Sequence, residues 1–196
     1  MAEAAGGAVV PVVVDVTEPP GVERAWERTA GIGGRVRYVV NNAGPPSTEP
    51  LSVADGVQAA IGSYAAVTEG FVSRHQADAS SVCFVASISG NFRGGDTQDW
   101  YPAAKAGIAG YMRNVAVKLR GHPRANGVAP GVTLTRRTAD RYASAAAQQR
   151  LQASPMGRAA EADEVAAVIC FLLSPAASFV NGALVPVDGA STCANS

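Results

Sequence analysis

Three side chains in this sequence have the types and the spacing for proton transfer at an oxygen atom: Ser87, Tyr101 and Lys105. Tyr101 and Lys105 stand four residues apart, so on a helix they share one face. An ammonium group beside a phenol stabilises the phenolate, and we expect it to lower the pKa of Tyr101 towards neutral pH. Ser87 precedes Tyr101 by fourteen residues, and its hydroxyl can hydrogen-bond the same substrate oxygen. The trio predicts general acid–base chemistry on a carbonyl or alcohol oxygen, with a cofactor needed for any hydride.

The alternative is that Tyr101 and Lys105 form an ordinary surface pair on a helix. The chain has five tyrosines but only two lysines, so this spacing rarely arises by chance. Position is more informative than the count. An apolar strand is predicted over 81–86 and ends directly before Ser87, while Pro102 suits the first turn of a helix, where its missing N–H needs no partner. This context favours the functional interpretation.

Elements that can position the trio alternate along the chain. The hydrophobic pattern predicts strands over 9–14, 36–40, 81–86, 125–129 and 184–187, and helices over 19–30, 52–78, 100–119 and 161–173. The run Val9–Val14 is almost wholly β-branched, which is typical of a parallel strand covered on both faces. Alternation of this kind predicts a doubly wound α/β domain, with a parallel sheet flanked by helices.

Composition narrows the function classes. A chain of 196 residues is long enough for one domain with a sizeable core, spanning 1–196. Its formal net charge of zero provides no long-range field for nucleic acid or an anionic membrane, so neither is expected as a partner. No stretch approaches the roughly 20 apolar residues of a membrane span, and no basic leader precedes an apolar run, so the cytoplasm is the expected location. Three widely spaced cysteines predict neither a disulfide framework nor a metal site.

Two small-residue segments raise the question of a nucleotide site. The segment 41–44 (Asn-Asn-Ala-Gly) follows a predicted strand, and the carboxyl ends of strands are where open α/β sheets bind ligands. A plain turn is the alternative reading of that segment. The glycine cluster 31–34 follows a helix and precedes a strand, which is the reverse of a phosphate-binding loop. We interpret that cluster as the end of a helix.

These motifs, taken in order, resemble the short-chain dehydrogenase/reductase family, and the resemblance runs nearly from end to end of the chain. The segments that carry it are Asp15-Val16, Asn41-Asn42-Ala43-Gly44, Ser87 with Gly90, Tyr101-x-x-x-Lys105, Asn126-Gly127-Val128-Ala129-Pro130-Gly131, Thr135, Pro155-Met156-Gly157-Arg158 and Asp188-Gly189. Each motif is weak alone. Together and in this order they are highly specific.

The resemblance implies a Rossmann-like domain that interconverts a ketone and a secondary alcohol with NAD or NADP. It implies that Tyr101 is the general acid, that Ser87 polarises the substrate oxygen and that Lys105 holds the nicotinamide ribose. It further implies that Asp15 and Val16 contact the adenine, that Asn41, Ala43 and Gly44 line the dinucleotide, and that Pro130, Gly131 and Thr135 border the nicotinamide. The segment 132–157 is expected to shape the substrate site.

The sequence also departs from the family pattern. An asparagine that relays protons to the lysine is usual in the family, and the best match here is Ser63. The opening strand, the Thr-Gly-x-x-x-Gly-x-Gly phosphate loop and the next strand do not occur, so we expect an N-terminally truncated member that lacks roughly 30 residues. A sheet without that unit should expose an edge and associate more readily.

Two functions remain open at this stage. One is an NAD(P)-dependent oxidoreductase acting on a small carbonyl or alcohol compound, as a homodimer or homotetramer. The other is a catalytically silent relative that keeps the binding or oligomerisation surface, with the small residues of 100–119 as its interface. A serine nucleophile at Ser87 is a distant third, because no histidine or carboxylate is placed to activate it.

Overall fold

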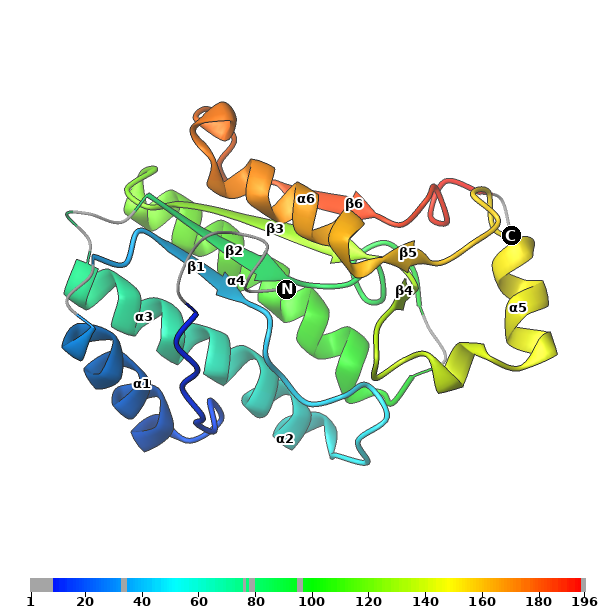
Figure 1. Ribbon diagram of the computed structural model, residues 1–196, viewed down its shortest axis with the longest axis horizontal. Coiled ribbons are helices and arrows are strands. Elements are labelled where there is room, and N and C mark those ends of the chain that lie inside the picture. Colours follow the sequence, from blue (N-terminus) through cyan, green and yellow to red (C-terminus); the bar gives the residue numbers. More distant parts are fainter. Residues whose placement is uncertain (1–8, 33–34, 76, 78–79, 95–96, 195–196) are drawn as a thin grey trace.

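The computed structural model describes residues 9–32, 35–75, 77, 80–94 and 97–194. Its centre is a four-stranded sheet with the order β1-β2-β3-β6, in which all three pairings are parallel. The strands are β1 (Tyr38–Asn41), β2 (Ser81–Val85), β3 (Arg124–Pro130) and β6 (Leu184–Val187). Figure 1 shows helices on both faces of this sheet, as predicted for a doubly wound α/β domain.

The two faces of the sheet carry separate cores because side chains alternate along each strand. On one face, Val82 and Phe84 of β2 pack with residues of the four helices α1 (Pro19–Gly31), α2 (Val53–Val57), α3 (Ser63–His75) and α4 (Trp100–Leu119). On the other face, Cys83 packs with Val165 and Leu172 of α6 (Ala162–Leu173). A π-helix, Gln58–Gly62, joins α2 to α3, so the single helix predicted over 52–78 contains a distortion near its middle.

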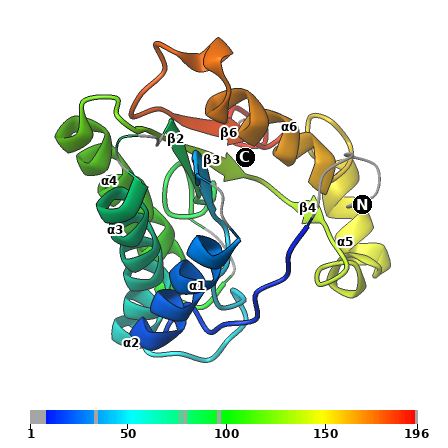
Figure 2. The same ribbon diagram turned by 60° about the vertical axis from the view of Figure 1, so that its left-hand side comes forward.

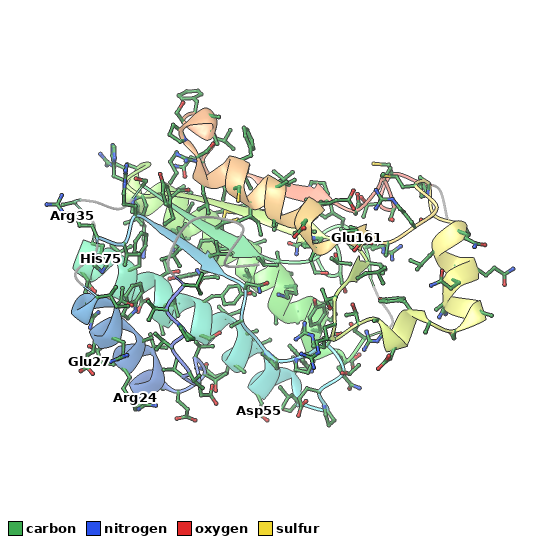
Figure 3. All side chains as sticks on the ribbon, viewed as in Figure 1. Arg24, Glu27, Arg35, Asp55, His75 and Glu161 are labelled. Atoms are coloured by element: carbon green, nitrogen blue, oxygen red, sulfur yellow. The ribbon has the colours of Figure 1, made fainter. Side chains whose placement is uncertain are left out.

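Helix α1 illustrates how the sequence divides buried from exposed positions. It begins with prolines in its first turn, where missing N–H groups cost nothing. Val22 and Trp26 are buried one turn apart, whereas Arg24 and Glu27 point away from the sheet (Figure 3). The helix ends at Gly31, in agreement with the predicted terminator; Gly33 and Gly34 lie outside the described residues.

Most of the remaining elements lie beyond the carboxyl ends of the strands. They are the two-stranded sheet of β4 (Thr133–Leu134) and β5 (Ala160–Glu161), a 3-10 turn over Asp140–Tyr142 and helix α5 (Ala145–Gln152). The predicted 132–157 segment thus forms a separate arm, which Figure 2 shows at the side of the sheet opposite α3 and α4. A second 3-10 turn, over Pro175–Ala177, lies at the opposite end of the sheet, near Arg124 at the start of β3.

The predicted strand Val9–Val14 is wrong. The segment is extended but belongs to no strand, and Val9 and Val13 expose 68% and 99% of their surfaces. A β-strand is stabilised by backbone hydrogen bonds to a neighbour, and β1 pairs with β2 alone among the described strands. Figure 2 shows the segment running at a distance from β1, so β-branched composition alone did not produce a strand.

Within the described ranges, no helix is long and apolar enough to cross a membrane. The same residues contain no cluster of histidine, cysteine or acidic side chains able to hold a metal ion. Cys83, Cys170 and Cys193 are free thiols.

Candidate active site

The site forms where the carboxyl ends of β1, β2 and β3 meet at one edge of the sheet. Backbone pairing continues beyond β2, because Ala86 N–H donates to the Val128 carbonyl at 2.8 Å and Ile88 N–H donates to the Pro130 carbonyl at 3.1 Å. These bonds hold Ser87 against the end of β3. Ser87 is 9% exposed, which places its hydroxyl in a largely buried position.

Tyr101 is held at the entrance of α4 by its neighbour Trp100. The Trp100 indole is 1% exposed, donates to the Glu49 carbonyl at 2.9 Å, and stands edge-on to the Tyr101 ring with centroids 5.5 Å apart. Trp100 also packs directly on Gly56, where a Cβ would lie 2.4 Å from the indole. The α2–α4 packing therefore fixes the catalytic end of the helix.

Lys105 lies one helical turn after Tyr101 on α4. Its ammonium donates to the Val85 carbonyl at 2.8 Å and lies 5.6 Å from the centroid of the Tyr101 ring. It also lies 5.7 Å from the centroid of Tyr64, whose hydroxyl donates to the same Val85 carbonyl at 3.3 Å. Two aromatic rings and a backbone carbonyl thus stabilise a cation in a poorly solvated place.

The electrostatics correct one sequence prediction. Burial, with a smaller contribution from the charge of Arg137, lowers the pKa of Lys105 to about 8. Burial raises the pKa of Tyr101, although a hydrogen bond from Ser87 and the charges of Arg137 and Arg141 oppose that shift. The expectation that Lys105 would bring the tyrosine pKa down is therefore wrong for this conformation, in which loss of solvation outweighs the favourable charges.

The Ser87 oxygen accepts the Ser89 backbone N–H at 3.1 Å. The Ser87 hydroxyl is also close enough to the Tyr101 phenol to oppose the rise in its pKa. Ser87, Tyr101 and Lys105 are therefore brought together, as the spacing predicted. Each of the two hydroxyls has one proton that can be donated to a substrate oxygen placed between them, which suits a carbonyl or an alkoxide.

Three of the residues implied for cofactor contact line a single cavity of about 230 Å³. They are Val16, Asn41 and Ala43, and the walls come from α1, β1 and α3. The Asn41 amide, however, donates to the Thr68 hydroxyl at 2.9 Å, so it also ties β1 to α3. The cavity is mainly apolar and lies next to the exposed backbone of 42–44.

Asp15 and Gly44 do not line that cavity. The Asp15 carboxylate accepts the backbone N–H and the hydroxyl of Thr17 at 2.8 and 2.7 Å, and these bonds lower the pKa of Asp15. Gly21 packs against the Asp15 carbonyl, where a Cβ would lie 2.0 Å away, so the turn leading into α1 is tight. Gly44 is exposed with open space around its Cα.

Pro130, Gly131 and Thr135 lie on the far side of Ser87. Pro130 is the last residue of β3, and Gly131 donates to the Val187 carbonyl at 3.0 Å. A Cβ at Gly131 would lie 3.0 Å from Asp188, so the ends of β3 and β6 approach closely there. The Thr135 hydroxyl is 3.0 Å from that of Thr138, which holds the turn that begins the 132–157 arm.

Ser63 is the position matched to the relay asparagine of the family, and no described hydrogen bond joins it to Lys105. Its hydroxyl donates to the Ala60 carbonyl at 3.1 Å, at the end of the π-helix. Two other residues, which sequence reasoning did not single out, contact the trio: Tyr64, whose ring lies beside the Lys105 ammonium, and Asn91, whose amide donates to the Ser87 and Lys105 carbonyls. No local pattern indicated them, because Tyr64 and Asn91 both meet Lys105 from other segments of the chain.

Comparison with known proteins completes the description of the site. A family model described as "Enoyl-(Acyl carrier protein) reductase" matches residues 1–192. Levodione reductase of Leifsonia aquatica is 34% identical over 203 residues, covering 95% of this chain and 75% of that protein. Cis-4-hydroxycyclohexanecarboxylate dehydrogenase of Sinomonas cyclohexanicum is 36% identical over 206 residues, covering 96% and 78%. The crystal structure of levodione reductase superposes with a TM-score of 0.89 at 31% identity, over 99% of this chain and 81% of that one.

Proposed function

Since the chain belongs to the short-chain dehydrogenase/reductase family, we propose that it interconverts a ketone and a secondary alcohol, with Tyr101 as the general acid and base. Ser87, Tyr101 and Lys105 are its catalytic residues. The observation that carries the proposal is the Lys105 ammonium 5.6 Å from the centroid of the Tyr101 ring, with the Ser87 segment held against the same helix by the Asn91 amide.

The residues present fit part of a nicotinamide dinucleotide. Members of this family use NAD or NADP. The cavity beside β1 is smaller than the roughly 300–1,000 Å³ of typical ligand sites, so it can hold one end of such a cofactor. We propose Val16, Ala43 and Gly44 for the adenosine side, together with Asp15 and Asn41 at its rim. Pro130, Gly131 and Thr135 would hold the nicotinamide side, and Lys105 and Tyr101 would contact the ribose.

The bound cofactor supplies the hydride, and the side chains manage the proton. In the reductive direction the Ser87 hydroxyl hydrogen-bonds the substrate carbonyl and stabilises the negative charge that develops on its oxygen. Tyr101 then donates its phenolic proton to that oxygen. The ammonium of Lys105 stabilises the resulting phenolate, and with a pKa of about 8 it is protonated at neutral pH. In the oxidative direction each of these steps runs in reverse.

The pyrophosphate of the cofactor needs donors that the sequence does not provide in the usual form. No Thr-Gly-x-x-x-Gly-x-Gly segment occurs in residues 1–196, and β1 has an unpaired outer edge among the described strands. We propose that residues 1–196 by themselves bind NAD(P) weakly. The catalytically silent alternative follows if no binding occurs.

We propose a small carbonyl or alcohol compound as the substrate and a homodimer or homotetramer as the working form. One relative is named for a hydroxycyclohexanecarboxylate, so 4-oxocyclohexanecarboxylate is a reasonable first ketone. The outward face of α4 favours assembly, because Gly110 meets open space and Val117 is 76% exposed. The three free thiols fit a reducing compartment, which supports the cytoplasm as its location.

The test measures cofactor binding and turnover in the purified chain. NADH and NADPH are titrated by calorimetry, and reduction of 4-oxocyclohexanecarboxylate is then followed for the wild type, for Tyr101→Phe and for Tyr38→Phe. We expect Tyr101→Phe to lower kcat by about 10²–10⁴-fold. Tyr38 lies at the opposite end of β1 and is 40% exposed, so Tyr38→Phe should change little. Absence of both binding and turnover in the wild type would favour the silent alternative.

A further inference from the structure

The segment after β2 folds back on itself and packs against the first turn of α4. The Ile88 carbonyl accepts the backbone N–H groups of residues 91, 92 and 93 at 3.3, 2.9 and 3.2 Å, and Gly90 N–H donates to the Arg93 carbonyl at 2.8 Å. Gly90 has a φ of +81°, and a Cβ there would lie 2.0 Å from the Pro102 carbonyl. Only glycine permits both this conformation and this close approach.

Asn91 stands in this turn with its side chain between the two catalytic segments. Its Nδ2 donates to the Ser87 backbone carbonyl at 2.9 Å and to the Lys105 backbone carbonyl at 3.0 Å. The orientation of the amide is determined by its partners. Both are carbonyl oxygens, which can only accept, so the NH₂ group and not Oδ1 must face them. The two protons of one nitrogen thus link the end of β2 to the second turn of α4.

No other side-chain hydrogen bond among the described contacts links the backbone at the end of β2 to the backbone of α4. Lys105 Nζ donates to the Val85 carbonyl, but a long, flexible side chain does not hold two segments at a fixed distance. The Asn91 side chain is short and half-buried, so its two hydrogen bonds compete little with water. Ser87 and Tyr101 must present two hydroxyl groups to one substrate oxygen, and their separation depends on the distance between these two segments.

We propose that Asn91 is a positioning residue of the active site, which sets the separation of Ser87 from Tyr101 and Lys105. This inference rests on the proposed function for its catalytic consequence, but not for its geometry. Loss of the amide lets the Ser87 segment move away from α4, which takes the Ser87 hydroxyl further from the Tyr101 phenol. Because the nearby Ser87 hydroxyl lowers the pKa of Tyr101, a larger separation raises that pKa.

The experiment compares Asn91→Ala, Asn91→Asp and Asn91→Gln with the wild type. Alanine removes the amide and aspartate places a carboxylate against two carbonyls, whereas glutamine keeps the donor on a longer arm. Asn114→Ala is the matched control, since Asn114 is exposed on the same helix. Each protein is labelled with ¹³C at the tyrosine Cζ, Tyr101→Phe identifies the Tyr101 signal, and the pH titration of that signal is followed without cofactor.

For Asn91→Ala and Asn91→Asp we expect the Tyr101 titration to move to higher pH. We also expect kcat to fall by roughly tenfold with KM changed less than twofold, because misplacing a reacting group costs turnover more than binding. Asn91→Gln should recover part of both effects, and Asn114→Ala should show neither. If Asn91→Ala does not fold, Asn91→Gln decides in its place, since it should move the titration in the same direction by a smaller amount.

An unchanged Tyr101 titration in a folded Asn91→Ala or Asn91→Asp protein would overturn the inference. The NMR readout needs neither cofactor nor substrate. A wild type without turnover would therefore refute the proposed function while the role of Asn91 is still decided by the titration.

Discussion

The two sides of the carboxyl edge differ in how completely they are built. Around β2 and α4 the side chains of the trio have fixed partners: Ser87 is bound by Ser89, and Lys105 by Val85. Around β1 the outer edge pairs with no described strand and Val40 exposes 43% of its surface, while Val13 in the segment that leads to α1 is almost fully exposed. The side around β2 and α4 is therefore preorganised, whereas the side around β1 is open.

The difference teaches that the proposed chemistry and the proposed cofactor binding depend on different parts of this fold. The trio of Ser87, Tyr101 and Lys105 is held by contacts between β2, β3 and α4, none of which needs the outer edge of β1. The cavity that we propose for the dinucleotide is bounded by α1, β1 and α3, and it adjoins the open edge. Substitutions should therefore have unequal effects on the two sides, and the largest should fall at the α2–α4 contact.

Trp100→Ala should have the largest effect on stability. The indole is buried, donates to the Glu49 carbonyl and packs on Gly56, so truncation leaves both a cavity and an unpaired carbonyl. We expect a loss of about 3–5 kcal/mol in the free energy of unfolding, measured by urea denaturation. Val13→Ala, on the open side, should change it by less than about 0.5 kcal/mol. Similar losses in the two variants would contradict the contrast drawn between the two sides.

Lys105 should make stability depend on pH in a defined direction. Its pKa in the folded chain is about 8, below the ordinary lysine value of 10.5, so the buried ammonium costs roughly 3 kcal/mol at neutral pH. Between pH 8 and 10.5 the unfolded chain binds the proton that the folded chain has lost. Stability from this group therefore rises with pH through that window, and its penalty is full below pH 8.

Lys105→Met isolates this effect. The variant should be more stable than the wild type at pH 7, and the advantage should shrink by about 2 kcal/mol at pH 9.5. The quantity to measure by urea denaturation is the difference in unfolding free energy between Lys105→Met and the wild type. Burial raises the pKa of Cys83 to about 12, so this thiol also makes stability depend on pH above neutral, but it does so equally in both proteins and cancels in the difference. A pH-independent difference would show that Lys105 is not desolvated.

Much of the fold was predictable because local pattern and tertiary environment agree. Helix α4 and strand β6 have the predicted bounds, and the Ser87–Tyr101–Lys105 trio assembles as the spacing indicated. Val9–Val14 failed because strand formation depends on a neighbour, which β-branched composition cannot supply. The segment is extended, as its residues prefer, but it is not paired.

The finer features of the site could not be predicted, because they depend on how far apart two segments lie. The Tyr101 pKa was expected to fall on the strength of an i, i+4 pair, yet burial raises it. Burial is a property of everything that packs around the phenol, including Trp100 from the same helix. Likewise, nothing in the sequence around Asn91 reveals that its amide meets the carbonyl of Lys105, fourteen residues away.

Val40→Lys should weaken self-association through the open edge. An exposed apolar edge strand is a template for pairing with a second chain, and a lysine on it opposes such pairing. We expect the association constant to fall by roughly tenfold, or about 1.4 kcal/mol, in sedimentation equilibrium. Val117→Lys on α4 is the matched comparison. If Val117→Lys dissociates the assembly and Val40→Lys does not, the contact lies on α4 and the edge of β1 is not an interface.

Arg137→Ala should have the smallest effect, and the positive charge of Arg137 determines the direction of the pKa shift at both Tyr101 and Lys105. Arg137 favours the phenolate of Tyr101 and disfavours the ammonium of Lys105, so its removal should raise the pKa of both groups. Because Arg137 is exposed, salt should screen the interaction, and the difference from wild type should fade at about 0.5 M salt. The ¹³C titration of Tyr101 measures this directly.

Arg150→Ala in α5 is the control, since Arg150 is not among the charges that act on Tyr101. An equal shift of the Tyr101 titration in the Arg150 variant would mean that the 132–157 segment acts through its net charge. The particular position of Arg137 would then not matter.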